Sequence, residues 1–305
     1  MIFKQMLVNF TGAAIATLLT VTPTASAQSS APPSLSDPVL GQTGTQVSRM
    51  QPPHPVMPTL PPLGRDLAVK HGLTVLLSQR TTNFNHASST QAKNMAVLAK
   101  RLNGVIVAPG ATFSYYRTVG PYTAENGFYW GRAFSGDRIV PSMGGGVCQG
   151  ASTLYSALMR TDLKVVERHQ HSLTVPYLPP GEDATVAGTY LDFKFKNSRA
   201  TPVMLAATAD LSRRYLTVAV WGKTAPPKIT VKHEILATYP YRTIRHCMSK
   251  ASEVGVKSPG QPGVKVKTWV VTEAANGSIE RYLGMDTYKA SPRIEDAVCV
   301  QSKRK

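Results

Sequence analysis

The chain has 305 residues, with 34 Lys and Arg against 17 Asp and Glu, a formal net charge of +17 at pH 7 and a hydrophobic content of 42%. This composition indicates a globular protein with enough apolar residues for one domain core and a smaller module. The basic residues are scattered and accompany no nucleic-acid recognition motif, so we expect an anionic cell-envelope surface as partner and no nucleic acid.

Residues 1–27 have the pattern of a secretory signal peptide. Lys4 precedes a short apolar run at residues 10–21, and Ala25-Ser26-Ala27 forms a small-residue cleavage site. Because the run is too short to span a bilayer comfortably, we expect cleavage and no stable transmembrane segment afterwards, with an uncleaved anchor as the alternative. The expected location is secreted or periplasmic, in association with the cell envelope.

Residues 28–72 are predicted to be a Pro-rich disordered linker. They contain Pro-Pro pairs at 32–33, 52–53 and 61–62 and show no apolar periodicity.

Residues 73–225 are predicted to form the main domain. A first strand is expected at 71–77, and Ala92, Met95, Leu98, Ala99 and Leu102 form one apolar stripe of a helix at 89–102. Short strands are expected near 105–107 and 138–140, with longer strands at 163–172 and 184–195. We expect an α+β fold in which a cysteine-bearing helix packs on an antiparallel sheet, followed by a small all-β C-terminal module.

The cysteine-bearing helix is the most informative element. Gly144, Gly145 and Gly146 lead into Cys148 and Gln149, and apolar residues then recur at helical spacing up to Met159. A cysteine in the first turn of a helix has a lowered thiol pKa, because unpaired N–H groups and partial positive charge gather there. The glycines would let a substrate backbone approach the sulfur. The alternative is an inert, buried cysteine.

The three cysteines separate into two groups. Cys247 and Cys299 both lie in the C-terminal part, and we expect them to form a disulfide in an exported protein. Cys148 is then the odd thiol and a candidate nucleophile.

Two histidines and two carboxylates follow the cysteine helix. His169 and His171 are two residues apart on a predicted strand and would share one face. We favour His171 as the general base, with His169 second and Asp192 or Asp183 as the group that orients it. A zinc site is the alternative use of such histidines, but no further Cys or His is near in sequence, so we expect no metal and no cofactor.

The stretch from about residue 77 to 207 resembles the VanW domain. The resemblance rests on motifs in matching order at residues 82–84, 93–94, 112–114, 119–121, 144–149, 152–155, 167–172, 179–181 and 183–186. The family takes its name from glycopeptide-resistance clusters, and its domain has been linked to L,D-transpeptidase activity. The resemblance implies that Cys148 of the Gly-Gly-Gly-Val-Cys-Gln motif is the nucleophile and that His169 and His171 are the motif histidines.

The function expected on this basis is an exported, cysteine-dependent L,D-transpeptidase-like acyl transfer on peptidoglycan stem peptides, which forms 3→3 cross-links. The alternatives are a non-catalytic peptidoglycan-binding protein and a cysteine peptidoglycan hydrolase. Arg168 is expected to hold a substrate carboxylate, or else to be a solvated charge. The predicted substrate-binding residues are Gly144, Gly145, Gly146, Gln149, Arg168 and Asp183.

Residues 226–305 are predicted to be a separate β module. Residues 260–269 alternate as a strand does, and Asn276-Gly277 indicates a hairpin turn. The pattern faintly resembles small glycine-containing β modules proposed to bind cell-wall glycans; a structural appendage without a ligand is the alternative.

Overall fold

The computed structural model describes residues 62–135, 138–248 and 255–298. The predicted signal peptide, the linker up to residue 61 and Cys299 lie outside the described residues. Within the described part of the chain, no helix has the length and apolar character that crossing a membrane requires.

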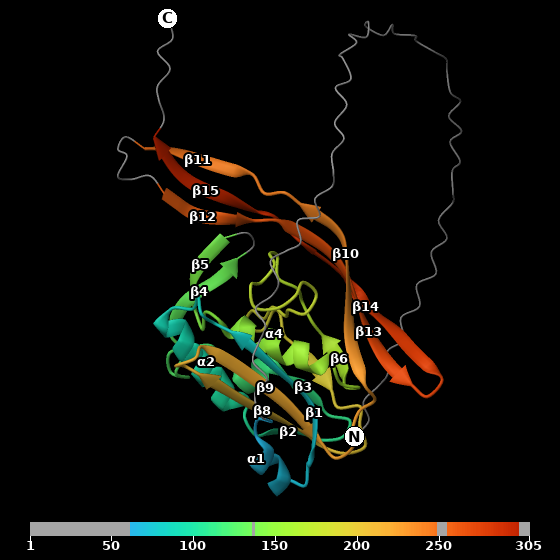
Figure 1. Cartoon of the computed structure of the whole chain (residues 1–305). Helices are drawn as coiled ribbons and strands as arrows, with labels where there is room; N and C mark the ends of the chain where they lie inside the picture. The colour runs from blue at the N-terminus through green and yellow to red at the C-terminus, as the bar shows by residue number, and fades with distance from the viewer. Residues whose placement is uncertain (1–61, 136–137, 249–254, 299–305) are drawn as a thin grey trace, which may run out of the picture. The chain divides into compact units, whose positions relative to one another are not determined.

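The main domain is built on a four-stranded antiparallel sheet. Its strand order is β1 (Val75–Asn83), β9 (Tyr215–Gly222), β8 (Val203–Asp210) and β2 (Val105–Val107). Helices α2 (Ser89–Leu102) and α4 (Val147–Leu158) contact each other and cover one face of this sheet (Figure 1). The structure is thus an α+β fold, as predicted.

Each face of the central sheet packs against a different element. On β8, Leu205 and Ala207 belong to the main core with the two helices, whereas the alternate residues Met204 and Ala206 pack with Ala68 of α1 (Arg65–Lys70). This alternation follows from the two-residue period of a strand. Because α1 lies inside the stretch predicted as linker, the expectation of disorder up to residue 72 is wrong at its end.

Smaller elements complete the main domain. A second sheet has the order β3 (Thr112–Ser114), β7 (Lys194–Lys196) and β6 (Lys164–Glu167), helix α3 spans Tyr115–Val119, and β4 (Trp130–Ser135) pairs with β5 (Arg138–Met143). The strands predicted at 163–172 and 184–195 are therefore much shorter than expected. The chain between Glu167 and Lys194 is mostly irregular and carries the histidines of interest.

The C-terminal module consists of strands alone in its described residues. One sheet has the order β10 (Ile229–Tyr239), β13 (Gly263–Ala274) and β14 (Gly277–Tyr288), and the other has the order β11 (Thr243–Met248), β15 (Ser291–Val298) and β12 (Gly255–Gln261). The hairpin predicted at Asn276-Gly277 joins β13 to β14, with Ala274 opposite Gly277. Strands β11 and β15 run parallel, and Cys247 lies opposite Ala297, two residues before Cys299 in sequence.

Cys247 is disulfide-bonded. Its pairing with Cys299 stays a prediction because Cys299 lies outside the described residues.

Candidate active site

Cys148 lies in the first turn of α4, directly after the glycine run. Gly146 has a φ of 102°, a backbone conformation that residues with a Cβ rarely adopt, and a Cβ there would lie 2.8 Å from Cε of Met95. Asn94 of α2 fixes the run by donating a 2.9 Å hydrogen bond to the carbonyl of Gly145. Every residue of α4 is buried except Cys148, which is half-buried. The helix therefore presents its cysteine at a surface and buries the remainder.

Cys148 is the first member of a chain of three hydrogen-bonded side chains. The Cys148 thiol is hydrogen-bonded to the side chain of His171, and Sγ also lies 3.4 Å from the carbonyl oxygen of Val186. The Nδ1 atom of His171 is 2.6 Å from Oδ2 of Asp183. Because Nδ1 faces the carboxylate, Nε2 is the ring atom left for the sulfur. A thiol, an imidazole and a carboxylate thus stand in the order that nucleophilic catalysis uses.

Asp183 is held at both oxygens. The backbone N–H of His171 donates to Oδ2 at 2.7 Å, and the guanidinium of Arg168 donates to Oδ1 at 3.0 Å. The hydroxyl of Tyr288, from strand β14, also donates to Oδ1. Since the Asp183 side chain is only 1% exposed, this full set of donors keeps a buried carboxylate ionised and fixed.

The electrostatics of these groups favour a charged pair. Burial raises the pKa of the Cys148 thiol, but the hydrogen bond and charge of His171 outweigh it, so the pKa lies below its ordinary value. Burial lowers the pKa of His171, but its hydrogen bonds to Asp183 and Cys148 raise it above its ordinary value. For Asp183, burial raises the pKa and the contacts with His171 and Arg168 lower it, with a net depression. Opposite shifts in one pair favour a thiolate beside an imidazolium at neutral pH.

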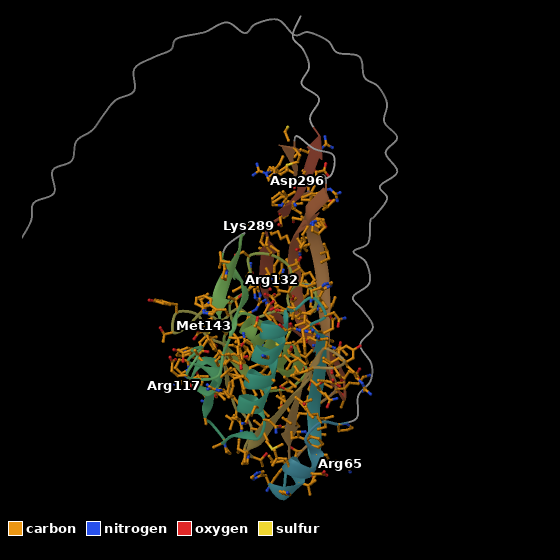
Figure 2. All side chains as sticks on the ribbon, turned by 90° about the vertical axis from the view of Figure 1, so that its left-hand side faces the viewer. Arg65, Arg117, Arg132, Met143, Lys289 and Asp296 are labelled. Atoms are coloured by element: carbon orange, nitrogen blue, oxygen red, sulfur yellow. The ribbon has the colours of Figure 1, made fainter. Side chains whose placement is uncertain are left out.

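Cys148 opens into a cleft of about 530 Å³. The glycine run, Gln149 and His171 line this cleft, as do Tyr122 and Tyr177. Arg132 of β4 and Met143 of β5, both labelled in Figure 2, also line it. A cleft of this size can bury an extended peptide segment of a few residues.

Two of the predicted catalytic residues lie elsewhere. The carboxylate of Asp192 accepts hydrogen bonds from the hydroxyl of Ser114 and the backbone N–H of Tyr116, where α3 begins. Asp183, not Asp192, orients His171. His169 faces the carboxylate of Glu167 at 3.0 Å and is not among the residues that line the cleft. The two histidines do not share one face because the strand ends at Glu167, before either of them.

Two of the predicted substrate-binding residues have structural roles instead. Arg168 is 14% exposed and its guanidinium is used by Asp183 and Asp286, so it has no free edge for a substrate carboxylate. Asp183 is buried against His171. Gln149 lines the cleft, but its amide donates to the Thr82 hydroxyl and the Asn83 carbonyl at 3.0 and 2.7 Å.

Sequence reasoning did not identify Tyr288 and Asp286 as neighbours of the site. The Arg168 Nη1 atom lies 2.7 Å from both carboxylate oxygens of Asp286, and Tyr288 reaches Asp183 across 105 residues of sequence. The one available signal is the two-residue spacing of Asp286 and Tyr288, which places both on one face of a strand such as β14.

A second buried charge cluster joins the two parts of the chain. Glu182, 2% exposed, forms two 2.9 Å contacts with the guanidinium of Arg160 and lies 3.0 Å from Nε2 of His233 on β10. Arg80 of β1 lies 3.5 Å away on the same carboxylate. No group of three or more metal-ligating side chains with suitable geometry occurs among the described residues.

Comparison with known proteins identifies the domain that carries this site. Residues 90–221 match the family model described as VanW like protein. The chain is 35% identical over 153 residues to the uncharacterized protein YoaR of Bacillus subtilis (strain 168), and this match covers 50% of each chain. It is 28% identical over 124 residues to the vancomycin B-type resistance protein VanW of Enterococcus faecalis (strain ATCC 700802 / V583), which covers 38% of this chain and 44% of that protein. The chain thus matches half or less of the length of these relatives.

Two solved structures also match part of the chain. The crystal structure of HP0197-G5 has 14% identity and a TM-score of 0.13, and covers 23% of this chain and 96% of that one. The G5 domain of IgA1 protease has 17% identity and a TM-score of 0.17, and covers 26% of this chain and all of that one. At these scores neither match carries an argument about function.

The motif resemblance found at residues 77–207 is thereby confirmed, and residues 90–221 of this chain form a VanW-like domain.

Proposed function

We propose that this chain is an exported cysteine acyltransferase of the L,D-transpeptidase type, which acts on peptidoglycan stem peptides and forms 3→3 cross-links. The observation that carries the proposal is the continuous contact of Cys148, His171 and Asp183 at a cleft large enough for a peptide. The VanW-like domain and the printed name of the Enterococcus relative, a vancomycin B-type resistance protein, support a role in the cell wall.

The first half-reaction is acylation of the thiol. The Cys148 thiolate attacks the carbonyl carbon of the third stem residue and forms a tetrahedral oxyanion, which backbone N–H groups at the start of α4 stabilise. The intermediate collapses, the amide bond to the fourth residue breaks, and the imidazolium of His171 gives its proton to the departing amine. Terminal D-Ala leaves, and the stem remains bound to Cys148 as a thioester.

The second half-reaction regenerates the thiol. An amine from the third residue of a neighbouring stem attacks the thioester carbonyl, and neutral His171 accepts a proton from that amine. The C–S bond breaks, a new amide bond forms, and the thiolate–imidazolium pair is restored. Asp183 stays ionised throughout and holds the ring in the orientation that both proton transfers need.

The proposed surroundings agree with the charge of the chain. A net charge of +17 favours the anionic polymers and head groups of a cell envelope. The predicted signal peptide would deliver the protein to that side of the membrane.

The test is intact-protein mass spectrometry after incubation with a tetrapeptide stem. We expect a mass increase equal to the mass of the tetrapeptide minus that of the released D-Ala, located on Cys148 by peptide mapping and absent in Cys148→Ser. Addition of an amine acceptor should discharge the adduct and yield a cross-linked dimer. Release of D-Ala without cross-links would assign a hydrolase instead. Binding to peptidoglycan without any adduct would contradict catalysis and assign a binding protein.

A further inference from the structure

The end of strand β14 lies against the irregular segment that carries His171. The amide of Gln170 donates to the carbonyl of Thr287 at 2.8 Å, and the backbone N–H of Lys289 donates to the carbonyl of Ser172 at 2.7 Å. The residues on either side of His171 are thus bonded to residues on either side of Tyr288. This contact fixes the position of an irregular segment that has no strand partner of its own.

Tyr288 enters the same contact through its hydroxyl. It donates to Oδ1 of Asp183 and accepts a 2.8 Å hydrogen bond from the backbone N–H of Gly181. The Tyr288 side chain is 1% exposed, so the hydroxyl cannot exchange these partners for bulk water. One buried group therefore fixes both the Asp183 carboxylate and the turn that carries it.

Asp286 binds Arg168, which is the other side chain that donates a hydrogen bond to Oδ1 of Asp183. Arg168 donates to Asp183 through Nη2 and Nε and to both oxygens of Asp286 through Nη1. Its guanidinium also lies over the ring of Tyr155, 5.2 Å from the centroid. Without the carboxylate of Asp286, a largely buried arginine would have one partner fewer to define its orientation.

The C-terminal sheet holds both residues rigidly. Tyr288 pairs with Val264 and Asp286 pairs with Val266 on strand β13. Val264, Val266 and Tyr288 together form a small buried cluster. The two side chains are therefore anchored by strand pairing and by packing, on an element separated from Cys148 by more than a hundred residues of sequence.

We propose that Tyr288 and Asp286 are positioning residues that hold Asp183 in line with His171, so that the active site is complete only with the C-terminal module in place. The inference rests on the function proposed above and assigns that module a role in the chemistry of the main domain. Neither residue lines the cleft, so both act through Asp183 and not on the substrate.

The experiment measures the alkylation rate of Cys148 by iodoacetamide in the intact chain, which requires no peptidoglycan. Rates are taken from about pH 5 to about pH 9 for the wild type and for Tyr288→Phe, with peptide mapping to confirm modification at Cys148. Loss of the Tyr288 hydroxyl frees one side of the Asp183 carboxylate and weakens its support of the imidazolium. We expect alkylation near neutral pH to slow by about tenfold, the effect of one charged hydrogen bond, and the midpoint of the profile to rise.

Tyr282→Phe is the matched control, because Tyr282 is on the same strand but 51% exposed; we expect a wild-type profile. A double-mutant cycle separates positioning from a general loss of structure. In an Asp183→Asn background, Tyr288→Phe should have almost no further effect, since it acts through the group already changed. Fully additive effects, or a wild-type profile for Tyr288→Phe, would overturn the inference.

Two further results keep the test decisive. If Tyr288→Phe does not fold, Asp286→Asn takes its place, with the same direction of change expected and a wild-type profile contradicting the inference. If the wild-type thiol itself titrates as an ordinary cysteine near ~8.5, the proposed function fails and not the positioning role alone.

Discussion

The main domain (residues 73–225) and the C-terminal module (the described residues from 226 to 298) maintain their structures in different ways. The main domain has two helices on a sheet and a large shared core around Leu98, Leu154 and Val218. In the module, the buried apolar cluster of the described residues is Val264, Val266 and Tyr288. Large apolar side chains such as Ile279 and Tyr282 are more than half exposed there.

This difference shows that a region with little core can still support a precise site. The module has too few buried side chains to hold its strands by packing alone, and its β13–β14 end is fixed against the main domain by Tyr288 and Asp286. The main domain in turn receives from the module two of the groups that hold its buried Arg168 and Asp183. Each region therefore depends on the other: the module for the position of its strands, and the main domain for the position of its buried side chains.

The largest effect expected is on chemistry in the main domain. Cys148→Ser replaces the thiolate by a hydroxyl that His171 cannot ionise to the same extent, so turnover should fall by about 10⁴-fold or more. The change is small, and the unfolding temperature should stay within a few degrees of the wild type. Chromatography and mass spectrometry of cross-linked stem peptides measure the loss; retained cross-linking would place the nucleophile outside Cys148.

The next largest effect is expected at the charge cluster that joins the two regions. Glu182→Gln leaves Arg80 and Arg160 without their buried carboxylate and should lower the free energy of unfolding by about 3 to 5 kcal/mol. Urea denaturation followed by circular dichroism measures this value. A loss below ~1 kcal/mol would show that the arginines find other partners.

The same carboxylate predicts a pH dependence. Burial raises the pKa of Glu182, but contacts with His233, Arg160 and Arg80 outweigh this and depress the pKa well below its ordinary value of 4.5. A depressed folded-state pKa stabilises the protein above the unfolded pKa, and this contribution is lost progressively as the pH falls below it. Stability should therefore decline below pH 4.5, and Glu182→Gln should show a flatter decline.

A smaller effect is expected in the C-terminal module. If Cys247 and Cys299 pair, reduction should remove about 3 to 4 kcal/mol from the module, because the bridge closes a long loop. The main domain should keep its own transition in the same thermal scan, and peptide mapping under non-reducing conditions identifies the pair. A bridge that includes Cys148 would contradict both the pairing and the free thiol of the structure.

The smallest predicted effect is the difference in turnover between the variants of the two histidines. His171→Ala should lower turnover by about 10²-fold, the usual loss for a general base. His169→Ala should change turnover by less than about threefold, because His169 faces Glu167 and not the cleft. Steady-state kinetics of both variants decide the matter, and the reverse ranking would make His169 the base.

Local patterns in the sequence predicted the cysteine helix well. The apolar spacing after Gly146 placed its last turn near Met159, and the helix ends at Leu158. The α+β class also followed from local patterns. Those signals depend on residues a few positions apart, which a single sequence displays directly.

The partners of His171 could not be predicted in the same way. The sequence predicts strands at 163–172 and 184–195 joined by a turn, with Asp192 on the strand that follows the histidines. The chain is mostly irregular there, so its course depends on distant contacts, including Gln170 with Thr287. Asp183 is predicted both as the alternative to Asp192 for orienting the histidine and as a substrate-binding residue, because nothing local shows a buried carboxylate meeting Arg168, Tyr288 and His171 at once.

The pairing of β13 with β14 contains an irregularity whose consequence reaches the active site. Thr268 pairs with Gly284 and Trp269 pairs with Tyr282, so Leu283 is an extra residue on β14, beside a Gly284 with a φ of 144°. One extra residue reverses which side chains face which side of a strand. Asp286 and Tyr288 therefore point toward Asp183 only because of this bulge. If Leu283 were paired as a regular strand residue and did not bulge, every side chain of the site would still be in the sequence and yet both supports would turn away from it. Deletion of Leu283 would instead leave Gly284 opposite Thr268 and both supports directed as they are.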